Sequence, residues 1–138
     1  MDERKPVLEM KNISKSFAGK IANDDISLKI NQGEIVALLG ENGAGKTTLM
    51  NILFGLYKPD AGEIYIDGER ADIKSPLDAI RLGIGMVHQH FMLVSAFNSY
   101  ENITLSLAEK KLGRIDSKSI KEMIETTSEK FDLTVHPN

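Results

Sequence analysis

Residues 40–47 read Gly40-Glu41-Asn42-Gly43-Ala44-Gly45-Lys46-Thr47, and they fit the pattern G-x-x-x-x-G-K-[ST] at every fixed position. The three glycines let the backbone curl so that successive N–H groups point inward at a phosphate. The N-terminus of the helix expected from Lys46 adds partial positive charge at the same place. A lysine in the first turn of a helix is electrostatically unfavourable unless an anion is bound there. The stretch therefore predicts a phosphate-binding loop.

The side chains at the end of this loop predict how a nucleoside triphosphate is held. Lys46 is placed to reach the β- and γ-phosphates, the Thr47 hydroxyl to ligate Mg²⁺, and Thr48 to hydrogen-bond the α-phosphate. An ordinary glycine-rich turn that caps a helix is the weaker alternative, because a strand pattern precedes the loop and a lysine follows it. The predicted nucleotide-binding residues of the loop are Gly40, Asn42, Gly43, Ala44, Gly45, Lys46, Thr47 and Thr48.

Strand and helix patterns alternate around the loop, which predicts an α/β fold. Residues 35–39 are five consecutive apolar residues, a run typical of a strand covered on both faces in a parallel sheet. Residues 84–88 predict another buried strand. Between them, apolar positions recur at helical spacing and predict a helix from about Lys46 to Leu56.

Other segments predict antiparallel strands. Residues 7–13 and 26–30 alternate apolar and polar side chains, as half-buried strands do, and a turn at 31–33 closes the second. Residues 64–66 and 71–73 are expected to form a hairpin around a turn at 67–70. Ile64-Tyr65-Ile66-Asp67 also imitates a Walker B strand, but the Asp-Gly turn pair favours the hairpin, so Asp67 is not predicted to bind Mg²⁺.

Two further helices are predicted. Ser75 and Pro76 suit the N-cap and first position of a helix that ends near Gly83. A later helix is expected to begin at an Asp116 cap and to turn one apolar side toward the core. The residues of that side are Ile120, Met123, Ile124, Thr127 and Phe131. The chain therefore divides into a strand-rich part, 1–88, and a helical part, 89–138.

Composition excludes several classes of function. The chain has 138 residues, enough for one core, and a net charge of −3 without a basic block, so a nucleic-acid partner has no electrostatic support. No cysteine is present, which excludes disulfides and thiolate metal sites. His88 and His90 flank Gln89, but two histidines make a poor zinc site. No stretch approaches the ~20 apolar residues of a membrane span, so a cytoplasmic chain is expected.

Several further motifs accompany the loop, namely Ile13-Ser14-Lys15-Ser16-Phe17, Asp24-Asp25-Ile26-Ser27-Leu28, Gly33-Glu34-Ile35, Pro59-Asp60-Ala61-Gly62-Glu63-Ile64 and Met86-Val87-His88-Gln89. With these motifs, the chain resembles the ATP-binding domains of ABC transporters along nearly its whole length. Residues 85–94 are most similar to ATPases that serve importers of simple sugars or nucleosides.

The resemblance implies a P-loop NTPase fold, with a RecA-like core, a small antiparallel β-subdomain and the start of a helical subdomain. It implies ATP and Mg²⁺ as ligands. Phe17 matches the aromatic residue that stacks on adenine, and Gln89 matches the glutamine that meets Mg²⁺ and the attacking water. Lys46 and Gln89 are thus the expected catalytic residues, and Thr47 and Gln89 the expected metal ligands.

The resemblance also implies partners, namely transmembrane permease subunits and a second ATP-binding domain, at the inner face of the membrane. Residues after Gln89 match the region that contacts the permease, although Ser95, Asn98 and Ser99 stand where relatives more often have proline, threonine and valine. The family's signature motif, Walker B aspartate, catalytic glutamate and switch histidine would lie beyond Asn138, so the chain is expected to be the front portion of such a domain.

Two other functions stay open at this point. One is a different P-loop enzyme, such as a kinase or a GTPase, which guanine selection or phosphate transfer to an acceptor would reveal. The other is a module that binds ATP without turning it over.

Overall fold

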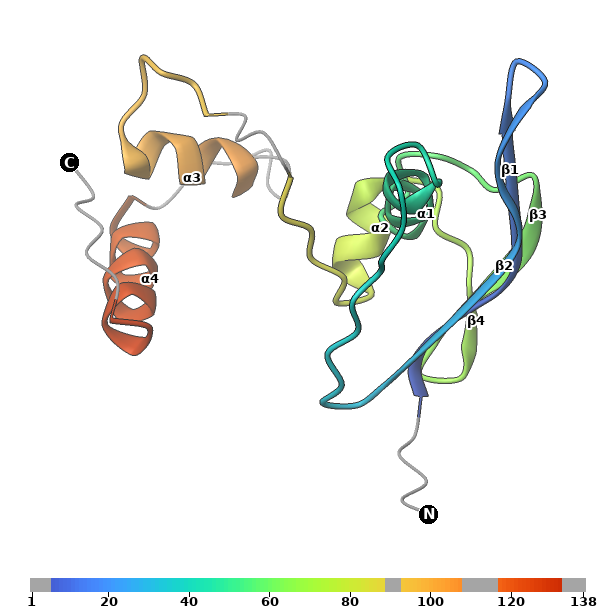
Figure 1. The fold of residues 1–138 in the computed structure, drawn as a ribbon. Coiled ribbons are helices and arrows are strands. Elements are labelled where there is room, and N and C mark those ends of the chain that lie inside the picture. Colours follow the sequence, from blue (N-terminus) through green and yellow to red (C-terminus); the bar gives the residue numbers. More distant parts are fainter. Residues whose placement is uncertain (1–5, 89–92, 108–116, 133–138) are drawn as a thin grey trace. The chain divides into compact units, whose positions relative to one another are not determined.

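The computed structural model describes residues 6–88, 93–107 and 117–132. The chain divides into two compact units, Met1–Val87 and His88–Asn138. The described residues of the first unit form a four-stranded antiparallel sheet with the order β2-β1-β3-β4, together with helices α1 and α2 (Figure 1). Those of the second unit form helices α3 and α4.

The longest strands, β1 (Pro6–Phe17) and β2 (Lys20–Asn31), form a hairpin. Ala18 and Gly19 make the two-residue turn, both with positive φ, which suits the right-handed twist of paired strands. The apolar residues of β1 that face inward are Leu8, Met10 and Ile13, all buried. The half-buried strands predicted at 7–13 and 26–30 are confirmed, and both extend further.

The hairpin of β3 (Ala61–Ile66) and β4 (Glu69–Ala71) is confirmed as well. Its turn is only Asp67-Gly68, with φ of 52° and 86°, so Ile66 pairs directly with Glu69. The return strand therefore lies earlier than the predicted 71–73. Ile73 is free to leave the sheet and is buried in the core instead.

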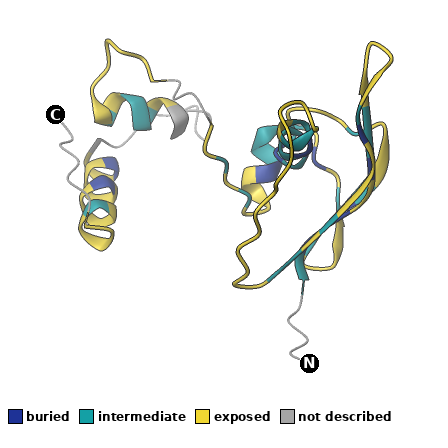
Figure 2. Ribbon diagram, viewed as in Figure 1, coloured by how far each residue is buried: buried dark blue, intermediate teal, exposed yellow. Residues whose placement is uncertain are grey.

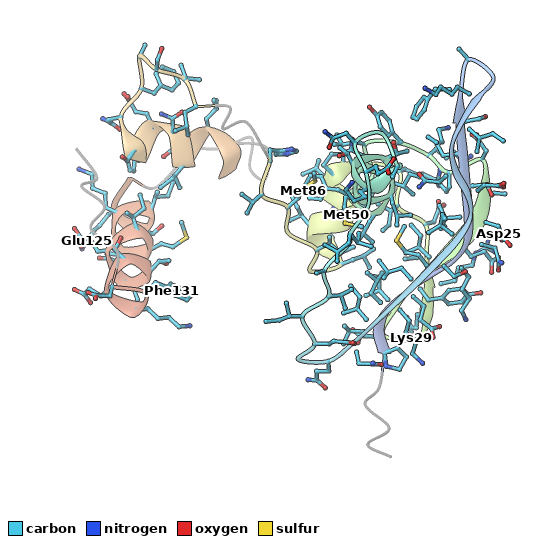
Figure 3. The ribbon with its side chains drawn as sticks, viewed as in Figure 1. Asp25, Lys29, Met50, Met86, Glu125 and Phe131 are labelled. Carbon is cyan, nitrogen blue, oxygen red and sulfur yellow. The ribbon has the colours of Figure 1, made fainter. Side chains whose placement is uncertain are left out.

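Two helices contribute to the core of the first unit. α1 (Lys46–Leu53) contributes the buried residues Leu49 and Ile52, and α2 (Pro76–Arg81) contributes Ala79. Figure 2 shows buried segments, in dark blue, on both helices. Half-buried Met50 and Met86, labelled in Figure 3, pack against this cluster. The buried cluster comprises Leu8, Met10, Ile13, Leu49, Ile52, Phe54, Ile64, Ile73 and Ala79.

Both helices end on a glycine in the left-handed region. α1 stops at Leu53, three residues before the predicted end, because Gly55 adopts a φ of 76° and the Leu56 N–H bonds back to the Asn51 carbonyl at 2.8 Å. A Cβ at Gly55 would meet the backbone of Ser75 at 2.6 Å. The predicted cap of α2 is confirmed, since Ser75 Oγ accepts a hydrogen bond from the Asp78 N–H.

The prediction of two parallel strands is wrong. Residues 35–39 and 84–88 form no strand; Ile35 is 98% exposed and Leu39 92% exposed. A strand exists only where a neighbour supplies hydrogen bonds, and neither segment pairs with the other or with the four-stranded sheet. Their apolar composition indicates burial, but no described strand lies beside them.

In the second unit, α3 (Ser99–Leu107) begins with a capping box: the Glu101 N–H donates to Asn98 Oδ1 and the Asn98 N–H donates to Glu101 Oε2, both at 2.9 Å. α4 (Ser117–Lys130) confirms the later predicted helix, whose Asp116 cap lies outside the described residues. No helix among the described residues has the length and apolarity needed to cross a membrane.

The predicted apolar side of α4 is only partly correct. Ile120 and Ile124 are buried, whereas Met123 and Thr127 are exposed. Phe131, labelled in Figure 3, is 62% exposed. Four-residue spacing brings Ile120 and Ile124 onto one narrow line of the helix. The wider stripe predicted from periodicity has no described neighbour to cover it.

Candidate phosphate-binding site

The predicted phosphate loop is an exposed turn that leads directly into α1. In Figure 2 this turn is the yellow segment just before the helix. Gly43 and Gly45 have φ of 87° and 82°, values that glycine adopts without the steric cost of a Cβ. The Ala44 N–H bonds to the Glu41 carbonyl at 3.2 Å and closes the turn. Two of the three predicted glycines, Gly43 and Gly45, thus supply the backbone curl that a phosphate cradle requires, whereas Gly40 does not adopt a positive φ.

Lys46 folds back over this turn. Its ammonium donates to the Gly40 carbonyl at 2.6 Å and to the Glu41 carbonyl at 2.8 Å. A positive charge therefore lies at the rim of the loop, held only by neutral oxygens. An anionic ligand would be a stronger partner for the ammonium than either carbonyl.

The N-terminus of α1 is available to the same ligand. Gly45 is the N-cap and offers no side chain, and the first turn holds no acidic residue. The first N–H groups of a helix lack partners within the helix, so an anion can satisfy them. Thr47 is exposed at this end, and Thr48 is half-buried beside it.

The hairpin of β1 and β2 contacts the loop through residues of β2. Asn23 Nδ2 in β2 donates to the Gly45 carbonyl at 3.2 Å. A Cβ at Gly45 would overlap the Ala22 carbonyl and lie 2.7 Å from Asn23 Nδ2. The absence of a side chain at Gly45 thus allows β2 to approach the loop closely.

Phe17 lies at the end of β1, on the same hairpin, and is 41% exposed. Its ring contacts Tyr57 edge-on at 5.1 Å between centroids, and Lys15 Nζ lies 5.4 Å from its centre. Phe17 does not belong to the buried core of the first unit. Tyr57 follows the C-terminal end of α1, while the phosphate loop precedes its N-terminal end.

Asp60 forms hydrogen bonds with residues at the end of β1, next to Phe17. Its carboxylate accepts from Lys15 Nζ at 2.7 Å, from the Ser16 N–H at 2.7 Å and from Ser16 Oγ at 3.0 Å. The Lys15 ammonium, followed by the Ser16 N–H, lowers the pKa of Asp60 from 3.8 to about 2. Asp60 is therefore a carboxylate across the physiological range.

The remaining predicted site residue, Gln89, lies outside the described residues, as does His90; His88 is described and exposed. Within the described ranges, no cluster of three or more histidine, aspartate or glutamate side chains could hold a metal ion. Sequence reasoning overlooked Asn23, Tyr57 and the support from Asp60. A polar residue in the middle of a strand was the available signal for Asn23.

Comparison with known proteins identifies the family. The sequence profile of the ABC transporter family matches residues 23–137. The chain belongs to the ABC transporter family. The resemblance predicted from the motifs around the phosphate loop is thereby confirmed.

Curated relatives of this ABC family chain include import ATP-binding proteins. It is 56% identical over 131 residues to the guanosine import ATP-binding protein NupO of Bacillus subtilis, and 50% identical over 132 residues to the nucleoside import ATP-binding protein NupA of Lactococcus lactis. It is 49% identical to the ribose import ATP-binding protein RbsA of Clostridium tetani. These alignments cover 95–96% of this chain and 26% of each relative, so the chain spans about a quarter of their length.

Solved structures confirm the α/β fold class of an ABC ATPase cassette. A nucleotide-free ATP-binding cassette from an ABC transporter superposes with a TM-score of 0.72 at 26% identity, over 87% of this chain and 52% of that one. A dimeric cassette in a post-hydrolysis state with ADP and Pi gives 0.62 at 32% identity, over 83% and 53%.

Proposed function

We propose that this chain is the ATP-binding part of an ATPase subunit that powers import of a small solute, a sugar or a nucleoside. The observation that carries the proposal is the junction of the loop and α1. There, glycines in the left-handed region, a helix N-terminus without a side-chain cap and the Lys46 ammonium lie together at one exposed turn. That combination suits a polyphosphate. The import ATP-binding relatives supply the class of solute.

In this proposal, the ligand is bound from both ends. The base stacks on Phe17, and the triphosphate lies in the loop against the first N–H groups of α1. Lys46 exchanges its two carbonyl partners for the β- and γ-phosphate oxygens. The residues proposed to bind the nucleotide are Phe17, Gly40, Asn42, Gly43, Ala44, Gly45, Lys46, Thr47 and Thr48.

The donor set around Thr47 also fits Mg²⁺, because this ion prefers oxygen ligands and is commonly shared between one protein oxygen and the phosphates. Thr47 carries a hydroxyl and is exposed at the start of α1. Gln89 is proposed as the second protein ligand and as the group that orients the attacking water. When bound, the ion neutralises charge on the phosphates.

The surrounding assembly is proposed from the family. Residues 1–88 form the β-subdomain and the nucleotide-binding core, and residues 89–138 begin the helical subdomain. The helical part meets transmembrane permease subunits at the inner face of the membrane, and a second ATP-binding domain completes the site. No nucleic acid takes part, in keeping with the net charge of −3.

The test removes the Lys46 ammonium. A charge-assisted hydrogen bond contributes roughly 1.5–3 kcal/mol, so Lys46→Ala weakens ATP binding at least about tenfold. Binding is measured by titration with fluorescent ATP. Lys29→Ala is the matched control, because Lys29 is an exposed lysine of β2 whose ammonium lies 3.7 Å from Glu9, outside the loop. Equal affinities of the two folded variants would remove the proposed function.

A further inference from the structure

Asn23 is a buried polar side chain whose chemistry the core does not require. It is 5% exposed, and the other residues buried in the first unit are hydrophobic. Its Nδ2 donates to the Gly45 carbonyl at 3.2 Å, while its Oδ1 is buried and has no hydrogen-bond partner among the described residues. Since a carbonyl only accepts, the amide must present Nδ2 to Gly45, and its orientation is assigned without ambiguity.

This arrangement is unfavourable for stability alone. A buried acceptor without a partner loses its hydration and gains nothing in return. Asparagine is also poorly suited to strands, where a branched apolar side chain would pack well. The polar identity of Asn23 therefore needs a reason outside core packing, and the phosphate loop is what it contacts.

The contact acts on one particular peptide group. The Gly45 carbonyl accepts from the Leu49 N–H at 2.9 Å as well as from Asn23. Because the peptide between Gly45 and Lys46 is planar and trans, its C=O and N–H point in opposite directions. Holding the carbonyl toward Leu49 and Asn23 aims the Lys46 N–H away from the helix, toward the anion site at its N-terminus.

The strand that carries Asn23 also pairs with the strand that carries Phe17, on which the base is proposed to stack. Asn23 pairs in register with Lys15, whose ammonium binds Asp60 and lies over the Phe17 ring. One pair of strands thus holds the loop through β2 and Phe17 through β1. A change at position 23 that left β1 intact would disturb the phosphate side alone.

We propose that Asn23 is a positioning residue for phosphate recognition: its side-chain amide fixes the peptide between Gly45 and Lys46 so that the Lys46 N–H faces the phosphate. The inference rests on the proposed ATP-binding function and extends it to a residue outside the loop. Asn23 acts through this peptide and does not touch the ligand itself.

The experiment uses Asn23→Leu, which keeps the number and branching of the side-chain heavy atoms, removes the donor and also removes the unpartnered acceptor. We expect its unfolding midpoint to be unchanged or higher, while affinity for ATP and for inorganic tripolyphosphate falls about fivefold for each, the size of one lost hydrogen bond. Phe17→Ala is the opposite control: we expect it to lower the affinity for ATP and to leave the affinity for tripolyphosphate unchanged. Ile13→Val, a core substitution in β1, lowers stability and changes neither affinity.

Two results separate this inference from the function on which it rests. Unchanged affinities in a folded Asn23→Leu chain overturn the role of Asn23 and leave the proposed function standing. A wild-type chain that binds neither ATP nor tripolyphosphate overturns both. If Asn23→Leu does not fold, nuclear magnetic resonance of the wild-type chain decides: tripolyphosphate must shift the Asn23 side-chain amide and the Lys46 N–H together, and a shift of the Lys46 signal alone contradicts the proposal.

Discussion

A methyl group at Gly45 tests how closely β2 supports the phosphate loop. Gly45 has a φ of 82°, and Gly43 has a φ of 87°, so alanine suffers the same backbone strain at both positions, roughly 1–2 kcal/mol. Around Gly43 the space for a Cβ is open, whereas at Gly45 it is filled by the Ala22 carbonyl and by Asn23 Nδ2 at 2.7 Å. Gly43→Ala is therefore a matched control for Gly45→Ala.

The two variants differ only in what the new methyl group meets. Pushing backbone out of a packed contact costs roughly 1–3 kcal/mol, so Gly45→Ala loses about 2–5 kcal/mol of unfolding free energy against about 1–2 kcal/mol for Gly43→Ala. At an m-value of about 2 kcal/mol per molar urea, the extra loss lowers the midpoint by about 0.5–1.5 M. The assay is urea unfolding of both 138-residue variants, followed by far-UV circular dichroism.

Equal midpoints for Gly45→Ala and Gly43→Ala would refute this reasoning. They would mean that β2 does not lie against Gly45 in solution and that the hydrogen bond from Asn23 is not formed there. A Gly43 variant that was the less stable of the two would contradict the argument even more directly.

Three further outcomes are expected. The proposed stacking on Phe17 uses a π-face that every base presents, so ATP and GTP should bind with similar affinity and Phe17→Ala should weaken the binding of both alike. A GTP preference above about a hundredfold in competition titrations would favour a GTPase instead. Because the pKa of Asp60 is lowered from 3.8 to about 2, its contacts with Lys15 and Ser16 add stability above pH ~4 that is lost as the pH falls toward 2, and Asp60→Asn should flatten this part of a stability-against-pH curve; an identical curve would show that the contacts are absent in solution. In the proposed function the loop binds the ground state of ATP, which lowers Kd without lowering the reaction barrier, so phosphate release by residues 1–138 should not exceed that of Lys46→Ala. Turnover that disappears in this variant would show that the chain alone is catalytic.

Local features of the fold could be predicted because their signals span a few residues. The Asp67-Gly68 pair specifies a tight turn through its own φ values, and Ser75 caps α2 through an N–H three residues away. The phosphate loop belongs to the same class. Its motif combines glycines for the backbone with a lysine for the charge, and both act within eight consecutive residues.

Features that depend on distant partners could not be predicted in the same way. The apolar run at 35–39 correctly indicates a segment suited to burial, but a strand needs a neighbour, and no described strand provides one. On α4, helical spacing indicated a broad apolar side, while only Ile120 and Ile124 are buried. Periodicity predicts which residues share a face of the helix, but it does not predict which part of the protein covers that face.

By itself, the sequence determined the family, the glycine-rich loop at 40–47 and the local turns and caps, because each is encoded by residues that are neighbours along the chain. Only the tertiary structure brought Asn23 to Gly45 and Asp60 to Ser16, across separations of 22 and 44 residues. Asn23 is an ordinary polar residue until the hairpin of β1 and β2 packs against the loop, and Asp60 is one acidic residue among many until it meets the end of β1. Contacts of this kind form between segments that are far apart in the sequence, and the spacing of residues along the chain does not predict which distant segments pack together.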